Sequence, residues 1–278
     1  MSITTEIERI KTNIANAYTV CEGKGATLPT TLNSENLSNC ISSITGGGGA
    51  TGYIPYGLMA GYSGYGCEGG TTWEDFSGNG RNMTMYNNPT FDSENLAWSF
   101  NGTNQYGGVN FTAPSYDFTI EVYGFVPQIV GNLLVMFGTG WNWYAGYGLI
   151  NSYDNNPSRA TGFIATSTGS TQTLAINPST VLQLGVKTKT ILRRHASDGK
   201  ITITNISVNG REDKSSTLTT SAIKADAQKF TVAAMNLRSN EENKFTKGSY
   251  HAVRLYERCL TDEEIEQNHN EDVRLYGV

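Results

Sequence analysis

Four consecutive glycines, at residues 46–49, constrain the fold of this chain more than any other feature. Glycine loses the most backbone freedom on ordering, so such a run holds neither helix nor strand cheaply and is typical of a linker. Before it the only aromatic residue is Tyr18, whereas after it aromatic, glycine-punctuated segments alternate with a period of two. We therefore predict a helical segment at 1–45, a linker at 46–52 and a β-domain at 53–278.

Before the glycines, apolar residues recur at alternating steps of four and three, the spacing of one face of an amphipathic helix. They are Ile3, Ile7, Ile10, Ile14, Ala17 and Cys21. Gly23 is expected to end this helix, and Ser34 to cap a second, shorter helix that carries Leu37 and Ile41. Helices this short are marginal in water. The stripe therefore needs a partner, which is the second helix, further copies of the chain, or another protein.

Isoleucine at both core positions of such a stripe favours three strands over two in a coiled coil. We therefore predict a homotrimer that assembles through this segment. The residues expected to carry oligomerisation, or attachment to another protein, are Ile3, Ile7, Ile10, Ile14, Leu37 and Ile41.

After the glycines, short apolar runs of strand length are separated by turn residues. Phe118, Ile120 and Val122 alternate with other side chains, as in a strand with two different faces. Asp198-Gly199 and Asn209-Gly210 each follow an apolar run, which predicts two hairpins. Strands this numerous, without alternating helices, predict an all-β fold in which two antiparallel sheets pack as a sandwich.

One helix is expected in this second segment, close to its C-terminal end. Thr261 and Glu264 have the spacing of a capping box, and Leu260 and Ile265 have that of a hydrophobic staple. The densest acidic run of the chain, at 262–266, falls in this helix, where carboxylates complement the positive end of the helix dipole. We therefore interpret this run as structural rather than catalytic.

The composition argues against several classes of function. There are 20 basic and 25 acidic residues, and the longest basic cluster is Arg193-Arg194, so no nucleic-acid partner is expected. No apolar run approaches the roughly 18 residues of a membrane span, and charges stand where a secretory signal would be apolar. The four cysteines lack metal-ligand spacing and are expected to be free thiols in a reducing cytosol.

Several motifs of the second segment together resemble laminin-G-like domains, which have a concanavalin A-like jelly-roll fold. In the order typical of that family they are GLMAGY at 57–62, WEDFSGNG at 73–80, FNGTNQY at 100–106, DFTIE at 117–121 and GSYHAVRLYERCLTDEEI at 248–265. The resemblance implies a jelly-roll sandwich and is specific to the fold rather than to a ligand. One position departs from it: Tyr62-Ser63-Gly64 stands where members often have Tyr-Asp-Gly.

The first segment is similar to the N-terminal region of tailed-bacteriophage structural proteins, such as tail and fibre components. The similarity covers residues 1–45 and includes AY at 17–18, KGA at 24–26, LP at 28–29 and NSENL at 33–37. It implies a protein of the virion, made in the host cytoplasm, whose first segment binds other virion proteins.

The concanavalin A-like fold also occurs in glycoside hydrolases and polysaccharide lyases, so catalytic residues have to be sought. The hydrolases place two carboxylates on one strand face as Glu-x-Asp-x-Glu, and the chain has no such triplet. His195, His251 and His269 have no spacing that pairs them with one another or with a carboxylate. Neither a nucleophile elbow nor a phosphate-binding loop is present. We therefore expect no enzymatic activity.

One stretch has the composition of a sugar-binding platform, in which a flat ring contacts the C–H face of a pyranose and amides bind its hydroxyls. Its candidate residues are Trp141, Asn142, Trp143, Tyr144, Tyr153 and Asn155. The alternative is that aromatic residues of this stretch, Tyr147 among them, pack in the core of the sandwich.

Calcium is the cofactor that the resemblance implies, because laminin-G-like domains often hold an ion at the rim of the sandwich. Asp75 and Asn79, in the turn at 73–80, are the candidate ligands, with Asp154 and Asn155 as a second pair. The alternative is that Asp75 fixes this turn by accepting hydrogen bonds from its backbone.

Together these features predict a non-catalytic virion protein, of the fibre or appendage type, that recognises a host-surface glycan. Two alternatives stay open, namely a purely structural protein that decorates the capsid or tail, and a polysaccharide depolymerase. No membrane partner is expected.

Overall fold

The computed structural model of the chain describes residues 3–23, 28–42, 52–112, 114–125, 134–135, 147–151, 160–165, 171–176, 185–217, 228–234 and 245–277. Contacts within the chain divide it into two compact units, Met1–Ala50 and Thr51–Val278. The boundary between them falls in the glycine-rich segment interpreted as a linker. Within the described residues, no helix is long and apolar enough to cross a membrane.

The first unit contains two helices, as predicted. α1 (Ile3–Gly23) ends at the expected glycine, and α2 (Ser34–Ser42) packs against the C-terminal half of α1. Tyr18 and Cys21 of α1 are buried together with Cys40 of α2. Because α2 is short, it covers only this part of the longer helix.

The start of α2 corrects one detail of the prediction. Asn33, and not Ser34, caps the helix, because Asn33 Oδ1 accepts a hydrogen bond from the backbone N–H of Asn36 at 2.9 Å. Asn and Ser are similarly good capping residues. A tertiary contact also holds the cap, since the Tyr18 hydroxyl donates to the carbonyl oxygen of Asn33 at 2.8 Å.

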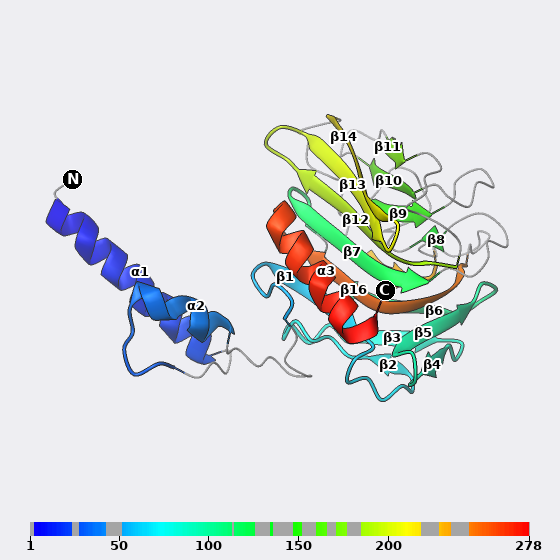
Figure 1. The fold of residues 1–278 in the computed structure, drawn as a ribbon, viewed down its shortest axis with the longest axis horizontal. Helices are drawn as coiled ribbons and strands as arrows, with labels where there is room; N and C mark the ends of the chain where they lie inside the picture. The colour runs from blue at the N-terminus through cyan, green and yellow to red at the C-terminus, as the bar shows by residue number, and fades with distance from the viewer. Residues whose placement is uncertain are drawn as a thin grey trace. The chain divides into compact units, whose positions relative to one another are not determined.

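The second unit is built on an eight-stranded antiparallel sheet (Figure 1). Its strands lie in the order β14 (Gly210–Thr217), β13 (Lys200–Ser207), β12 (Lys187–His195), β7 (Phe118–Phe125), β16 (Lys247–Tyr256), β5 (Ala97–Asn101) and β4 (Thr90–Asp92), and β1 (Leu58–Ser63) also pairs with β16. Both predicted hairpins are present: β12 turns into β13 through Asp198-Gly199, and β13 turns into β14 next to Asn209-Gly210.

Two four-stranded antiparallel sheets face this large sheet. One has the order β11 (Thr171–Ile176), β10 (Ala160–Ala165), β9 (Tyr147–Asn151) and β8 (Leu134–Val135). The other has the order β15 (Gln228–Val232), β6 (Tyr106–Phe111), β3 (Met83–Tyr86) and β2 (Thr72–Trp73).

A shared hydrophobic core lies between the large sheet and the two small ones. Alternation along β7 has the predicted phase, because Phe118, Ile120 and Val122 all belong to this core. Trp73 enters the core from one small sheet and Leu149 from the other. The predicted antiparallel two-layer sandwich is therefore confirmed.

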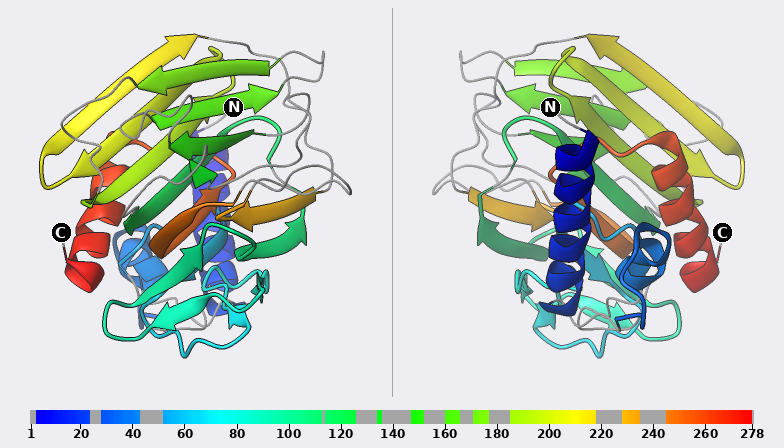
Figure 2. Two further views of the ribbon diagram at one scale, coloured as in Figure 1. Left: turned by 90° about the vertical axis from the view of Figure 1, so that its right-hand side faces the viewer. Right: turned by 90° about the vertical axis from the view of Figure 1, so that its left-hand side faces the viewer.

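The opposite face of the large sheet is covered by α3 (Asp262–Tyr276), the predicted C-terminal helix (Figure 2). Thr261 and Glu264 form the expected capping box. Leu260 and Ile265 are buried in one cluster between the helix and the sheet, as the staple requires. The central strands of the large sheet are therefore buried on both faces.

Candidate functional site

Four charged residues lie buried between α3 and the large sheet. Glu121, Lys189 and Arg254 come from the neighbouring strands β7, β12 and β16, at positions that alternate with core-facing residues. Asp272 comes from α3. The side chains of all four, here called the charged cluster, are 0% exposed.

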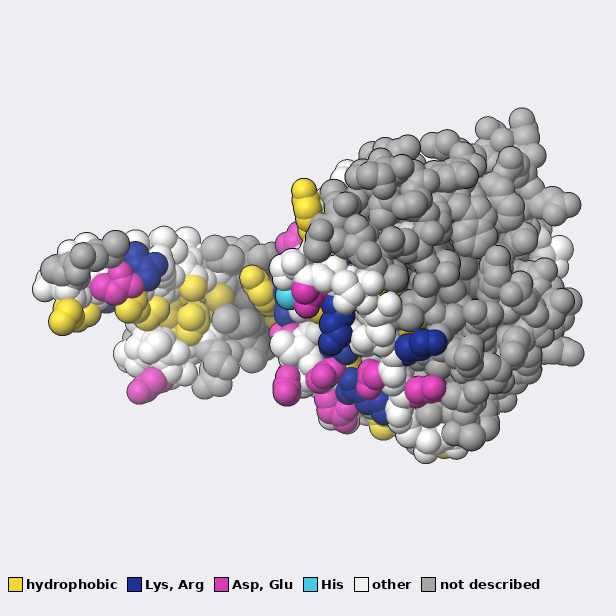
Figure 3. Space-filling model, turned by 90° about the horizontal axis from the view of Figure 1, so that it is seen from above, with side chains coloured by type: hydrophobic (Ala, Val, Ile, Leu, Met, Phe, Trp, Pro, Cys, Tyr) yellow, Lys and Arg dark blue, Asp and Glu magenta, His cyan; other side chains and the backbone are white. Residues whose placement is uncertain are grey.

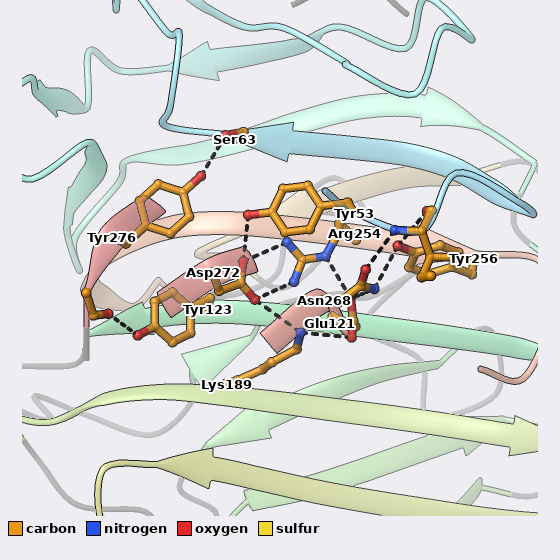
Figure 4. A network of polar contacts seen from close by, with 12 residues as sticks. Tyr53, Ser63, Glu121, Tyr123, Lys189, Arg254, Tyr256, Asn268, Asp272 and Tyr276 are labelled. Atoms are coloured by element: carbon orange, nitrogen blue, oxygen red, sulfur yellow. Dashed lines mark hydrogen bonds and ion pairs between the residues drawn. The ribbon is translucent and has the colours of Figure 1, made fainter. Parts of the chain in front are cut away.

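The charged cluster closes a ring of alternating charges (Figure 4). Arg254 donates from Nε to Glu121 Oε2 at 2.7 Å, and from Nη1 and Nη2 to the Asp272 carboxylate at 2.8 and 2.6 Å. Lys189 Nζ lies 3.0 Å from Glu121 Oε1 and 3.1 Å from Asp272 Oδ2. Two positive and two negative groups thus neutralise each other away from water.

Neutral side chains add further hydrogen bonds to the charged cluster. The Tyr53 hydroxyl donates to Asp272 Oδ1 at 2.7 Å, and Asn268 Nδ2 donates to Glu121 Oε2 at 2.7 Å. Asn268 Oδ1 accepts from the backbone N–H of Ile54 at 2.8 Å. The residues that follow the linker are thereby bonded to the C-terminal helix.

The pairing fixes the charge states of the cluster. Burial by itself raises the pKa of Asp272, but Arg254 and Lys189 outweigh it and lower that pKa to about 2. Burial lowers the pKa of Lys189, although Asp272 and Glu121 oppose the shift. Because the four groups are shielded from solvent and already paired, they hold α3 on the sheet and are not placed to exchange protons with a substrate.

Asp75, a candidate calcium ligand, lies in the turn after β2 and is buried. Its Oδ1 accepts from the backbone N–H groups of Gly61 and Ser77, both at 2.9 Å. Its Oδ2 accepts from the Ser77 hydroxyl at 2.8 Å and from the backbone N–H of Arg81 at 2.9 Å. Four protein donors therefore occupy the carboxylate, which fixes the turn and joins it to β1.

Asn79, the second candidate, takes part in the same turn. Its Nδ2 donates to the carbonyl oxygens of Leu58 and Met59 at 3.1 and 3.0 Å. Calcium takes six to eight oxygen ligands, which come from carboxylates, carbonyl groups and waters. The turn does not fit this requirement, and the described residues hold no group of three or more His, Cys, Asp or Glu side chains for a metal ion. The pair Asp154 and Asn155 lies outside the described residues.

The predicted sugar platform also lies outside the described residues, which include none of Trp141, Asn142, Trp143, Tyr144, Tyr153 and Asn155. The neighbouring strand β9 is described, and its first residue, Tyr147, is 3% exposed. The Tyr147 ring stacks on Phe118 with centroids 3.9 Å apart. Tyr147 therefore belongs to the core, in agreement with the alternative interpretation for this one residue.

The predicted attachment residues fall into two groups. Ile14 and Leu37 are partly buried in the contact between α1 and α2. Ile3, Ile7 and Ile10 are exposed along the N-terminal half of α1. Ile41 lies within α2, and its side chain is outside the described part of the chain.

A polar and aromatic surface that the sequence did not indicate lies on the sheet formed by β3, β6 and β15. Tyr86 and Tyr106 face each other across β3 and β6 and stack with centroids 4.5 Å apart. Lys229 of β15 extends over them, with Nζ 3.9 Å from the Tyr86 ring centroid and 3.2 Å from the Tyr106 hydroxyl. Gly108 makes this reach possible, because a Cβ at that position would lie 2.5 Å from Lys229 Cε.

Amide side chains border this tyrosine–lysine surface where β3 ends and β6 begins. Gln105 Nε2 donates to the carbonyl oxygens of Asn87 and Asn88 at 3.2 and 2.7 Å, and Asn87 Nδ2 donates to that of Asn104 at 2.6 Å. Asn87 and Asn88 both have positive φ angles, which Asn tolerates better than most residues. The amide donors named here are engaged with backbone carbonyls, so the Lys229 ammonium beside the tyrosine rings is the group that suits a ligand with hydroxyl or carboxylate groups. The only sequence signal was that Tyr-Asn and Gln-Tyr pairs stand at the ends of two strands.

The family of the chain follows from the sandwich and from its sequence. Residues 101–266 match the family described as the Concanavalin A-like lectin/glucanases superfamily. The chain belongs to this superfamily, and the resemblance to laminin-G-like, concanavalin A-like domains is confirmed. No curated protein matches the chain.

Solved structures support the same fold. The chain is similar to the Trypanosoma rangeli sialidase in complex with sialic acid, with a TM-score of 0.56 and 16% identity over 97% of this chain and 40% of that one. It is similar to the binding domain of botulinum neurotoxin serotype G, with a TM-score of 0.56 and 12% identity over 78% of this chain and 51% of that one.

A further similar structure is that of botulinum neurotoxin type C, which depends on interaction with two ganglioside molecules to enter cells. Its TM-score is 0.55 and its identity 10%, over 78% of this chain and 52% of that one. The chain thus spans between 40% and 52% of these three proteins. Likeness at such low identity establishes the concanavalin A-like fold alone.

Proposed function

We propose that the protein is a non-catalytic, carbohydrate-binding component of a tailed-bacteriophage virion, of the fibre or appendage type. The observation that carries the proposal is the combination of two separate units: a sandwich of the lectin/glucanase superfamily, and a helical unit with an exposed apolar stripe. The sandwich binds the ligand, and residues 1–45 attach the protein, as a homotrimer, to other virion proteins.

Two observations favour a host-surface glycan as the ligand, with acidic sugars among the first to test. The similar solved structures include a sialidase with sialic acid and a neurotoxin that interacts with gangliosides. On the described surface, Lys229 lies beside two tyrosines and an amide-rich border. We place the main sugar platform at residues 141–155, where tryptophans and asparagines are concentrated.

The absence of catalysis is proposed from the way in which carboxylates are used. Among the described residues, Glu121 and Asp272 are buried and paired with cations, and Asp75 fixes a turn. Glycoside hydrolysis instead needs two carboxyl groups that flank the bond to be cleaved. These three carboxylates are committed to the fold.

A glycan array that includes sialylated glycans, probed with the full chain, tests the ligand class. One aromatic platform contributes on the order of 1 kcal/mol beyond area burial, so we expect weak binding by a single site and stronger adsorption by whole virions. Trp143→Ala should abolish adsorption of virions to host cells and leave the melting temperature unchanged. Tyr116→Ala, at a tyrosine that is 60% exposed, is the matched control and should change neither quantity.

The remaining outcomes separate the alternatives. A folded chain that binds no glycan, together with Trp143→Ala virions that adsorb normally, would favour a purely structural role on the particle. New reducing ends released from a host polysaccharide would instead identify a depolymerase. Unfolding of the Trp143→Ala variant would place that ring in the core.

A further inference from the structure

The apolar stripe of α1 is covered by α2 over only part of its length. Tyr18 and Cys21 are buried against α2, at 1% and 4% exposure. Ile3, Ile7 and Ile10 are 80%, 47% and 47% exposed. Hydrophobic side chains are correspondingly visible on the surface of this unit in Figure 3. Within the described part of the chain, the N-terminal half of the stripe is left without a covering element.

Charged residues on the two sides of this exposed face have opposite signs, which is the pattern that pairs one copy of the helix with another. Glu6 directly precedes Ile7 and Lys11 directly follows Ile10, so the two charges are five residues apart on opposite sides of the stripe. In heptad notation Ile7 is an a position and Ile10 a d position, so Glu6 is a g position and Lys11 is the e position that follows it. In a parallel, in-register coiled coil, a g residue of one helix lies beside the e residue five places later on the neighbouring helix. A second copy of this helix therefore meets Glu6 with Lys11.

Within one chain these charges have exposed partners on their own helix. Glu6 pairs with Arg9 and Lys11 pairs with Glu8, and the four side chains are between 41% and 67% exposed. Such exposed pairs contribute little to stability. Glu6 and Lys11 can therefore turn to an adjacent helix at small cost, while Arg9 and Glu8 lie on the outward side of the helix.

We propose that three copies of the chain associate through Ile3, Ile7 and Ile10 as a parallel, in-register coiled coil, in which Glu6 of each copy pairs with Lys11 of the next. Isoleucine at both kinds of core position favours three strands over two. C-terminal to Ile14, the apolar stripe of α1 is covered by α2 of the same chain and not by another copy. This inference rests on the homotrimer of the proposed function and adds its orientation and register. In a parallel coiled coil, the three sandwiches are all connected to the same end of the helices.

Sedimentation of the full chain over a range of concentrations tests the assembly. With only three isoleucine layers the association is weak, so a concentration-dependent monomer–trimer equilibrium is expected. Ile7→Asp should leave only monomer, since it places a charge in the centre of the contact. Its helical circular dichroism and the melting of the sandwich should be retained, because Ile7 is half-exposed within one chain.

Charge-swapped variants test the register. Glu6→Lys and Lys11→Glu should each weaken trimer formation by about tenfold or more, because repulsion replaces attraction at three contacts. The double variant should recover trimers, because it restores an opposite-charge pair at each of the three contacts. Glu8→Lys is the matched control: it makes the same change of charge and also breaks an intrahelical pair, but on the outward side, so it should leave the equilibrium unchanged.

Two results would overturn this inference. One is a chain that stays monomeric at every concentration, and the other is an equal effect of Glu6→Lys and Glu8→Lys. Glycan binding is measured separately on the array, so a monomeric chain that still binds glycan would overturn the coiled coil and leave the proposed ligand class standing. A trimer that binds no glycan would support the coiled coil and overturn the proposed ligand class.

Discussion

Ser63 takes over the position at which related domains often carry an aspartate. Its Oγ lies 2.6 Å from the hydroxyl of Tyr276 and accepts from the backbone N–H of Tyr65 at 3.1 Å. Its carbonyl oxygen accepts from Trp73 Nε1 at 2.8 Å. A neutral hydroxyl therefore joins the end of β1 to the last helix, and no buried charge has to be compensated there.

The next residue, Gly64, has no room for a side chain. A Cβ at this position would lie 1.9 Å from the carbonyl oxygen of Leu96. The backbone N–H of Gly64 also donates a hydrogen bond to the carbonyl oxygen of His251 at 2.8 Å, which holds the two segments together. Gly64→Ala should therefore destabilise the protein by about 3 kcal/mol or more, because two backbone segments must move apart. Urea unfolding of the full chain measures this loss.

Gly108→Ala is the control for Gly64→Ala, since neither glycine has a positive φ angle that an alanine would strain. At Gly108 the obstacle is Lys229 Cε, the far end of a flexible side chain, and not a backbone atom. We expect a loss below about 1 kcal/mol. Equal losses of stability in Gly64→Ala and Gly108→Ala would show that contact with a backbone atom does not explain the destabilisation at Gly64.

His251 makes the stability of the sandwich depend on pH. The ring is 2% exposed and packs against the rings of Tyr123 and Tyr276, and burial lowers its pKa to about 4 from the usual 6.5. Between these two values the unfolded chain binds more protons than the folded one. Stability should therefore fall as the pH drops from about 6.5 to about 4, by at most about 3 kcal/mol from this residue.

Urea unfolding at pH 7.5 and pH 4.5 measures this effect. His251→Gln should remove part of the difference. The remainder is expected from His269, whose pKa burial also lowers, and from Glu264 and Glu271, whose pKa values their arginine partners lower. Asp272 adds little in this window, because its pKa is lowered from 3.8 to about 2 and most of its contribution is lost at lower pH. An unchanged pH dependence in His251→Gln would contradict the assignment.

At the scale of elements, the charged cluster is what attaches α3 to the large sheet. Arg254 contacts Glu121 on β7, Asp272 on α3 and the ring of Tyr53, whose centroid is 4.1 Å from the guanidinium carbon. Arg254→Met should cost about 3–5 kcal/mol, because two buried carboxylates are then left with Lys189 as their only cation. The change is measured by chemical unfolding and by hydrogen exchange of the α3 amides.

Arg274 provides the matched control on the same helix. It pairs with Glu271 across three residues, and its side chain is 58% exposed. Arg274→Met should change stability by less than about 1 kcal/mol. If Arg254→Met and Arg274→Met lose similar stability, the charged cluster does not hold α3 on the sheet.

At the scale of the whole molecule, the two units should behave independently. Among the described residues, the core clusters of the sandwich consist of residues beyond the boundary at Ala50, and the bonds to α3 begin at Gly52. Deletion of residues 1–45 should leave a folded monomer with an unchanged melting temperature that no longer enters virions. Calorimetry and virion incorporation measure the two effects, and normal incorporation would place the attachment site elsewhere.

One strand lacks the apolar alternation that usually predicts a strand. β14 pairs with β13 at the edge of the large sheet and has the polar sequence GREDKSST, so the hairpin signal at Asn209-Gly210 is what indicates it. Its place in the sheet comes from the hairpin beside Asn209-Gly210 and from the ladder with β13. The tyrosine–lysine surface was missed for a related reason, because its residues come from three strands whose pairing no local pattern reveals.

The sequence by itself determined the features that depend on nearby residues. The two helices before the glycines, the alternation of β7 and the capping box at Thr261 each rest on signals within a few positions, and the family motifs supplied the sandwich. Only the tertiary structure decided which distant groups meet. Glu121 and Asp272, 151 positions apart in the sequence, share one arginine because strand register and helix packing bring them together, and local patterns carry no information about such contacts.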